Sequence, residues 1–497
     1  MSNASVFRFK QATFDFGNGH PVGVDLVADQ SVKAKNTHFT LLMGANGTCK
    51  SRILSCCVNL LKGIHERANT ELPRKERRLF RTDEPDRDMQ CSSATLLRDG
   101  ATCTVGEGPL FESGALLPSR VLAIANLVRD RFTFVDWDNF EDPFYYYLGV
   151  RQSSNLTTTG AMDRLVCDAV LKLLANESKY PSFSKWTRSI FPSSDIGLSF
   201  SRFSMRRFHD FFDDPEKSIG LQLGRGRRGE VPHRLNAIKP HLDDMRRVVR
   251  LIEENALALG DSGSLGMKQG GTVTICLDEL TPTVRQRLGK LSQAISIAAS
   301  IRLIGRPSLV LNVGKWLDFT QLSSGEQNLL STGARLLAFG APGSLIVIDE
   351  PEVSLNIAWQ QRYIDLISDA LVHAKGSHVI IASHSPYLVS DLRAENSTVV
   401  VVERGAEGLK FRSHPGEFWG WGSEAILYEV LGLPSASNYH FSRELAGVLK
   451  LVSEKSTDAE PFAKFLSKCD QLDFGPEAEP LKAVIGDIRK YAGRLKS

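Results

Sequence analysis

The stretch GANGTCKS, residues 44–51, lies between an apolar run at His38–Met43 and an amphipathic segment that begins at Lys50. It follows the pattern GxxxxGK[ST] except at one position, where Cys49 stands in place of glycine. In such a loop, backbone N–H groups and the N-terminus of the following helix face an anion. The stretch therefore predicts a phosphate-binding loop between a buried strand and a helix.

The side chains at the end of this loop predict a nucleotide site. Lys50 is expected to reach the β- and γ-phosphates, and Ser51 to ligate Mg²⁺. If Cys49 needs a left-handed backbone, its side chain costs roughly 1–2 kcal/mol, which weakens a micromolar site, worth about 8 kcal/mol, by about tenfold. A decayed loop that binds nothing is the alternative. The candidate nucleotide-binding residues here are Gly44, Asn46, Gly47, Thr48, Cys49, Lys50 and Ser51.

A second short motif, LSSGEQ at residues 322–327, reads as a Ser-Gly turn that opens a helix. Such a turn presents a hydroxyl and backbone N–H groups to an anion. Taken alone it also fits an ordinary helix N-cap. Its candidate nucleotide-contacting residues are Ser323, Ser324, Gly325 and Glu326.

Two further apolar runs end in polar side chains. SLIVIDE, residues 344–350, is expected to deliver Asp349 and Glu350 to the carboxyl edge of a sheet. There Asp349 would hold Mg²⁺ and Glu350 would polarise an attacking water; any buried strand that ends in two acids is the alternative. HVIIASH, residues 378–384, ends in His384, a second candidate catalytic residue, and a structural histidine is the alternative.

Together the four motifs, in this order, resemble the ABC-type ATPases of the SMC-like kind. The resemblance implies an α/β P-loop NTPase fold of ABC/SMC-like type, with an inserted helical domain and a helical C-terminal region. It implies ATP and Mg²⁺, a γ-phosphate contact by His384, and a signature turn at residues 322–327 that completes the site of another copy. A homodimer or a larger homo-oligomer follows. Gln152 is a candidate for the Q-loop, and a surface glutamine is the alternative; Asn356 stands where related ATPases often have His or Asp.

The stretch around the acidic and histidine motifs further resembles stand-alone bacterial ATPases of antiphage defence. FYYYLG at residues 144–149, after RDRF at 129–132, is similar to the PtuA-like ATPases of Septu and of Septu-like retron systems. That resemblance implies a separate nuclease of the HNH type and, in a retron, the reverse transcriptase with its DNA–RNA product. VVVVERG at residues 399–405 resembles a TOPRIM opening, but no DxD follows it, so Glu403 is expected to be a strand-end carboxylate.

The motifs and composition along the 497-residue chain also predict its domains. We expect an ATPase N-terminal part at residues 1–154 and a helical insertion at 155–265. An ATPase C-terminal part at 266–414 and a helical region at 415–497 follow. Neither a membrane-length apolar run nor a signal core is visible, and eight scattered cysteines make no zinc pattern, so a cytoplasmic protein with reduced thiols is expected.

The net charge of +3 does not decide whether the chain meets nucleic acid. Basic and aromatic residues alternate near Arg202–Phe208, and more arginines follow at 225–228. Such a cluster can hold single-stranded DNA by charge and stacking, or it can be a solvated helix face with a packed apolar side. Two other functions remain open: an ATP or dNTP sensor that does not hydrolyse, which Cys49 favours, and a DNA-repair ATPase of the RecF type.

Overall fold

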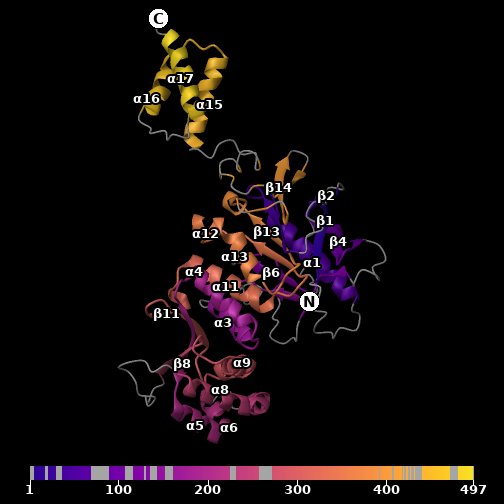
Figure 1. Cartoon of the computed structure of the whole chain (residues 1–497), viewed down its shortest axis with the longest axis vertical. Helices are drawn as coiled ribbons and strands as arrows, with labels where there is room; N and C mark the ends of the chain where they lie inside the picture. The colour runs from indigo at the N-terminus through magenta and orange to yellow at the C-terminus, as the bar shows by residue number, and fades with distance from the viewer. Residues whose placement is uncertain are drawn as a thin grey trace. The chain divides into compact units, whose positions relative to one another are not determined.

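The structure of this chain is a computed structural model with two compact units, Met1–Gly420 and Trp421–Ser497. Figure 1 labels the elements of both units. The structure describes residues 5–16, 21–28, 36–68, 89–106, 116–127, 130–134, 143–150, 161–223, 231–256, 271–390, 392–393, 395–405, 408–416, 418, 421, 423, 426, 430, 439–470 and 479–495.

A seven-stranded sheet in the first unit positions the candidate site (Figure 1), with the strand order β15-β14-β3-β13-β12-β6-β7. Its neighbouring strands run parallel except β14 and β15. Parallel strands are covered on both faces, which is why four of these strands read as near-continuous apolar runs and are buried throughout. The strands are β3 (His38–Met43), β6 (Val121–Ala125), β7 (Tyr145–Tyr147), β12 (Leu345–Asp349), β13 (His378–Ser383), β14 (Ser397–Gly405) and β15 (Gly408–Pro415).

The register of the parallel strands aligns the ends of the motifs. Met43 pairs with Ser383, and Ala382 in turn pairs with Asp349. On the other side of β12, Asp349 pairs with Ala125 of β6. Because parallel strands end at the same edge of a sheet, the segments that follow β3, β13, β12 and β6 begin next to one another.

Helix α1 (Lys50–Ala68) follows the loop after β3 and packs its apolar stripe into the core. Ile53, Leu54, Cys57 and Leu61 are buried, as their helical spacing predicts. The same core contains side chains from an antiparallel sheet of order β2-β1-β4-β5. Its strands are β1 (Phe7–Asp15), β2 (Val22–Asp25), β4 (Gln90–Arg98) and β5 (Ala101–Val105).

The hairpin between β4 and β5 turns at Asp99-Gly100, where φ is +50° and +90°. Two positive φ values are what a tight two-residue hairpin turn requires. Asp99-Gly100 is therefore the two-residue turn of this hairpin.

A buried polar network ties the antiparallel sheet to the parallel one. The backbone N–H of Phe9 donates to Nδ1 of His378 at 3.0 Å, and the His378 Nε2 lies 2.8 Å from the Thr40 hydroxyl oxygen. Burial lowers the pKa of His378 well below its ordinary value, so the ring stays neutral and accepts at Nδ1. This network lies on strands β1, β3 and β13, and it fixes β3 at the end opposite the phosphate-binding loop.

The first unit also contains a group of helices around the signature motif at residues 322–327. A second antiparallel sheet, of order β11-β10-β8-β9, belongs to the same unit. Helix α11, which the motif opens, packs so closely on α4 that a Cβ at Gly333 would lie 2.3 Å from the Trp186 ring. The helices are α3 (Ala161–Leu174), α4 (Lys179–Ile190), α9 (Pro282–Lys290), α10 (Ser292–Ser300), α11 (Ser324–Phe339), α12 (Ile357–Gln361) and α13 (Tyr363–Ala370). The strands are β8 (Asp195–Phe203), β9 (Gly271–Cys276), β10 (Pro307–Asn312) and β11 (Trp316–Asp318).

Four more helices follow β8 in the chain: α5 (Met205–Asp213), α6 (Pro215–Leu223), α7 (Val231–Ile238) and α8 (Leu242–Glu254). Three short 3₁₀ helices lie at η4 (Lys239–His241), η5 (Phe319–Gln321) and η6 (Pro386–Leu388). Phe203 and Phe208 are buried and meet edge to face with ring centroids 4.8 Å apart. Their rings serve packing, so the cluster at Arg202–Phe208 follows the solvated-face alternative rather than base stacking.

The second unit holds α15 (Tyr439–Ser453), α16 (Glu460–Cys469) and α17 (Glu479–Arg494) around an apolar cluster of its own. The helical C-terminal region is therefore present. The boundaries at residues 154, 265 and 414 stay predictions. Gln152 and the arginines at 225–228 lie outside the described residues. None of the described helices combines the length and apolar character that a membrane span requires.

Candidate functional site

The loop after β3 has the backbone that a phosphate cradle requires. A Cβ at Gly44 would lie 2.4 Å from the carbonyl oxygen of Val402, so only glycine fits there. Gly47 has φ +81° and Cys49 has φ +65°. The Cys49 carbonyl accepts the first helical hydrogen bond from Ile53 at 3.0 Å, so α1 begins directly after the loop and its N-terminus faces the loop.

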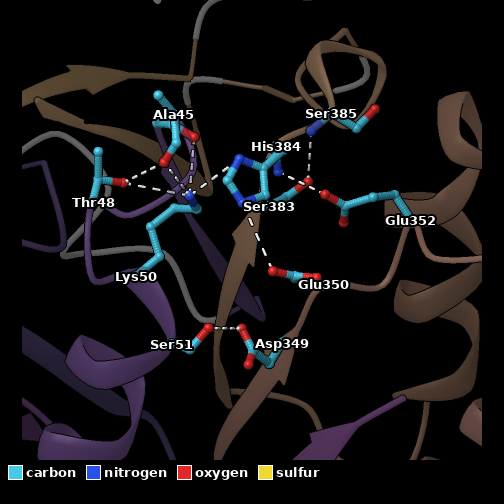
Figure 2. Close-up of polar contacts among 11 residues, drawn as sticks. Ala45, Thr48, Lys50, Ser51, Asp349, Glu350, Glu352, Ser383, His384 and Ser385 are labelled. Carbon is cyan, nitrogen blue, oxygen red and sulfur yellow. Dashed lines mark hydrogen bonds and ion pairs between the residues drawn. The ribbon is translucent and has the colours of Figure 1, made fainter. Parts of the chain in front are cut away.

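Lys50 is nearly buried, and its ammonium group lies inside the curve of the loop (Figure 2). Nζ donates to the carbonyl oxygens of Gly44 at 2.9 Å and Ala45 at 3.1 Å, and it lies 3.4 Å from the Thr48 hydroxyl. Burial lowers the pKa of Lys50 to about 8, although the nearby carboxylates of Glu350 and Glu352 oppose this shift. An ammonium group that donates only to neutral carbonyl oxygens can donate instead to phosphate oxygens, because charged oxygens are stronger hydrogen-bond acceptors.

Ser51 and Asp349 bring two oxygen ligands together. The Ser51 hydroxyl donates to Asp349 Oδ1 at 2.9 Å (Figure 2). Burial raises the pKa of Asp349 to about 6, and the hydrogen bond from Ser51 opposes that shift. Carboxylate and hydroxyl oxygens are ligands that Mg²⁺ accepts while it keeps several waters. The pair therefore suits Mg²⁺, whereas no group of three or more His, Cys, Asp or Glu side chains gathers into a metal site among the described residues.

Glu350 and His384 lie side by side at the ends of β12 and β13, as Figure 2 shows. His384 Nε2 is 3.7 Å from Glu350 Oε1, and its Nδ1 is 3.3 Å from Lys50 Nζ. Since a protonated lysine only donates, Nδ1 accepts and the neutral ring carries its proton on Nε2, toward Glu350. Burial, followed by the charge of Lys50, lowers the pKa of His384 and keeps it neutral. Glu350 has φ +47°, an uncommon backbone conformation that the strand end imposes at this position.

Glu352 is a residue whose role the sequence analysis missed. Its Oε1 accepts a 2.6 Å hydrogen bond from the backbone N–H of His384 (Figure 2), so it fixes the position of the segment that carries the histidine. Next to it, the Ser385 hydroxyl donates to Gln360 Oε1 at 2.6 Å, and Gln360 Nε2 donates to the Leu355 carbonyl at 2.8 Å. The segment after β13 is thereby tied to the loop at residues 351–356. A glutamate two residues after the strand-end acid was the available signal.

Asn126 is a second residue that the motifs did not reveal. It follows β6 directly, and its neighbour Ala125 pairs with Asp349. Both polar atoms of its side chain are buried and have no hydrogen-bond partner among the described residues. A buried, unpaired amide at this edge, one strand away from Asp349 and Glu350, is a group that a ligand could satisfy. Only the strand order identifies it, since no motif includes it.

The signature turn is built differently. Ser323 caps α11: its Oγ accepts from the Glu326 N–H at 3.4 Å, and its own N–H donates to Glu326 Oε2 at 2.7 Å. This reciprocal pair is a capping box. Ser323 and Ser324 are exposed, and within the described residues no hydrogen bond links the turn to the loop at 44–51.

The first turn of α11 packs on the loop that follows Glu350. A Cβ at Gly325 would lie 2.5 Å from the Ser354 carbonyl oxygen, and the Asn328 amide donates to the Val353 carbonyl at 3.0 Å. Asn356 caps α12 by accepting from the Trp359 N–H at 2.9 Å, which gives it a structural role. A movement of the signature turn therefore pushes directly on the segment that carries Glu350 and Glu352.

Glu403 is held in an ion pair with Arg412 on the neighbouring strand β15, and both side chains are partly exposed. It lies at the end of β14 and makes this contact on the sheet, as expected of a strand-end carboxylate. All eight cysteines are free.

Similarity to known proteins agrees with this geometry. The chain is 29% identical over 132 residues to the Septu protein PtuA of Bacillus thuringiensis, which is 26% of this chain and 31% of that protein. It is 31% identical over 130 residues to protein ea59 of Escherichia phage lambda, which is 26% of this chain and 24% of that protein. The chain thus aligns with under a third of each of these relatives. The expected resemblance to PtuA is confirmed over that part.

The structure is also similar to the SMC head domain from Thermotoga maritima, with 11% identity and a TM-score of 0.33 over 82% of this chain and 99% of that one. The predicted α/β P-loop fold agrees with the AAA-domain family model and with the largely parallel seven-stranded sheet. The family model described as "AAA domain, putative AbiEii toxin, Type IV TA system" matches residues 124–390. Since this match spans more than half of the chain, the protein belongs to that AAA-domain family.

Proposed function

We propose that this protein binds ATP with Mg²⁺ and hydrolyses it at sites shared between two copies of the chain, and that this cycle controls a partner nuclease in antiphage defence. The observation that carries the first part is the single cluster formed by Lys50, Ser51, Asp349, Glu350 and His384. The similarity to PtuA, a Septu protein, supports the setting.

The residues present fit ATP and Mg²⁺. Lys50 and the N-terminus of α1 would hold the phosphates, while Ser51 and Asp349 would hold Mg²⁺, which neutralises charge on the phosphates. The unpaired Asn126 amide offers a further polar ligand toward the same edge. Glu350 would orient and polarise the attacking water, and the Nε2 proton of His384 would donate to a γ-phosphate oxygen. Glu352 would keep His384 in position through the backbone.

The proposal of a shared site rests on what the signature turn does not do within one chain. The hydrogen bonds between Ser323 and Glu326 close on each other, and within the described residues none joins the two exposed serines to the cluster. An exposed helix N-terminus with a free hydroxyl suits a phosphate carried by another copy. In a symmetric dimer, two such sites would form together. The contact of Gly325 with Ser354 would then report occupancy of one site to the acids of the other.

The partner of this ATPase is proposed from the resemblance alone. We propose a separate nuclease of the HNH type and, in a retron, the reverse transcriptase with its DNA–RNA product. Purification of the protein with its neighbouring gene products, followed by identification of the proteins bound, tests this part. Recovery of replication and repair proteins in place of a nuclease would contradict it.

A second function has one observation in its favour. Cys49 places a side chain at φ +65°, where glycine is the unstrained choice. A strained loop favours a sensor that binds ATP or a dNTP and does not hydrolyse it. The two functions differ in a direct measurement.

Steady-state ATP hydrolysis by wild type and Glu350→Gln separates them. Removing a general base lowers the rate of the chemical step by about 10²–10⁴-fold. We therefore expect the ATP hydrolysis rate of Glu350→Gln to fall below detection while the variant still binds ATP. Glu454→Gln, which removes an exposed carboxylate that pairs with Lys450 in the second unit, is the matched control and is expected to keep full turnover. Binding without turnover in the wild type would favour the sensor.

A further inference from the structure

A pocket of about 340 Å³ lies away from the candidate nucleotide site, between helix α4 and the start of α9. It is lined by Tyr180, Pro181, Ser184, Lys185, Arg188, Asp278 and Arg285. Three of these side chains are cationic and one is anionic. No role in the proposed ATP cycle involves any of them.

The one carboxylate of the pocket is already satisfied. Oδ1 of Asp278 accepts from the Tyr180 hydroxyl at 2.8 Å and from the Ser184 hydroxyl at 3.0 Å. Oδ2 accepts from the Ile196 N–H at 2.9 Å and lies 3.3 Å from an Arg188 guanidinium nitrogen. A carboxylate with four donors offers little negative charge to a ligand. It acts instead as an internal clamp that holds α4 to strand β8.

The three cationic side chains of the pocket have fewer charged partners than Asp278 has hydrogen-bond donors. Arg188 shares its charge between Asp278 and Asp195, which lies 4.0 Å from it. Arg285 donates to the Leu277 carbonyl at 3.1 Å and lies over the Tyr180 ring at 4.8 Å, but it has no carboxylate partner among the described residues. Lys185 is exposed and likewise has no such partner within the described part of the chain. The pocket therefore keeps a net positive charge of about two that its own acids leave uncompensated.

The two helices that line the pocket are basic and each supplies it with cationic side chains, Lys185 and Arg188 from α4 and Arg285 from α9. Helix α4 has the sequence KYPSFSKWTRSI and α9 has PTVRQRLGK, so neither carries a carboxylate. Arg287 and Lys290 of α9 are also exposed, although at two and five residues from Arg285 they lie on other faces of the helix. A single small anion would use the pocket alone, whereas cations on two helices on either side of it match a ligand with repeated negative charges. Arginine suits phosphate because its planar guanidinium can donate two parallel hydrogen bonds.

We propose that this pocket binds the phosphodiester backbone of a nucleic acid, with Lys185 and Arg285 contacting phosphates. The site reads charge and not sequence, since its aromatic ring is covered by Arg285 and is buried. It goes beyond the proposed ATPase function and does not depend on it. Binding and hydrolysis of ATP can each fail or succeed independently of this site.

Fluorescence anisotropy of the full chain with a labelled oligothymidylate and with a labelled duplex of arbitrary sequence tests the proposal. We expect the wild type to bind, and we expect Lys185→Glu to weaken binding by about tenfold or more and to reduce the slope of log affinity against log salt by roughly one. Lys464→Glu, the same charge reversal at an exposed position of α16 in the other unit, is expected to leave affinity and slope unchanged.

Lys185 is exposed, so its substitution should not disturb the fold. Arg285→Gln serves as a second variant that removes the other cation proposed to contact a phosphate. A circular-dichroism spectrum and a thermal unfolding midpoint of Lys185→Glu equal to those of the wild type show that the fold is intact. The proposal is overturned if the wild type binds neither probe at low salt, or if Lys185→Glu and Lys464→Glu weaken binding equally. It is also overturned if inorganic phosphate at equal phosphate concentration displaces the oligonucleotide, or if a polyglutamate peptide binds at Lys185 and the nucleic acids do not.

Discussion

The loop that carries Lys50 and the turn that carries Ser323 each open a helix, yet their side chains are arranged in opposite ways. At the first, side chains from β12, β13 and α1 are in contact with one another and partly buried. At the second, the hydrogen bonds stay within residues 323–326 and the serines face solvent. Under the proposed function, one chain would hold one half of the chemistry assembled and would expose the other half to a second copy.

Lys50→Met tests the assembled half and should have the largest effect on binding. Loss of a charged hydrogen-bond donor at a phosphate costs up to about 3 kcal/mol, so ATP affinity should fall by roughly 100-fold. Titration with a fluorescent ATP analogue measures this. Lys410→Met, at an exposed position on β15, is the control and should bind as the wild type does. Equal affinity in Lys50→Met would mean that the loop is decayed.

The pH dependence of the assembled half should follow its two shifted groups. The Lys50 pKa is lowered to about 8, so the ammonium charge is present below that pH and is lost above it. The Asp349 pKa is raised to about 6, so its side chain carries a negative charge above that pH and is protonated and neutral below it. Affinity for Mg²⁺-ATP should therefore be highest between these values and should fall by up to about tenfold per pH unit outside them.

Lys50→Arg gives this pH profile its control. An arginine keeps its charge throughout, so the alkaline fall should vanish in the variant while the acidic fall stays. If the alkaline fall persists, another group causes it and the account of Lys50 is wrong.

Cys49→Gly should have a smaller effect, which sharpens the comparison at the loop itself. Removing a side chain at φ +65° relieves roughly 1 kcal/mol of backbone strain. We expect a free energy of unfolding about 1 kcal/mol higher and an ATP affinity raised by no more than about tenfold. Urea denaturation and ATP titration measure the two. Hydrolysis that is absent in the wild type and appears in Cys49→Gly would favour the sensor function.

Much of the assembled half could be predicted because its motifs end buried parallel strands. Runs such as LIVID and HVIIAS allow only one placement, and the strand order then brings Ser51 to Asp349 and His384 to Glu350. Asn126 could not be predicted, since its place depends on the pairing of β6 with β12, and the position of Glu352 in the sequence did not reveal that it binds the His384 backbone. The basic pocket was also missed, because α4 and α9 lie about a hundred residues apart and meet only in the fold.

The central claim is that each ATP site joins the phosphate loop of one copy to the signature turn of another. Mixing two inactive variants, Lys50→Met and Ser324→Arg, in equal amounts tests it most directly. If sites are shared, half of the dimers pair unlike chains and each of these contains one intact site, so ATP turnover should return to about a quarter of the wild-type value. A mixture as inactive as its components, in a preparation shown to exchange subunits, would contradict the claim.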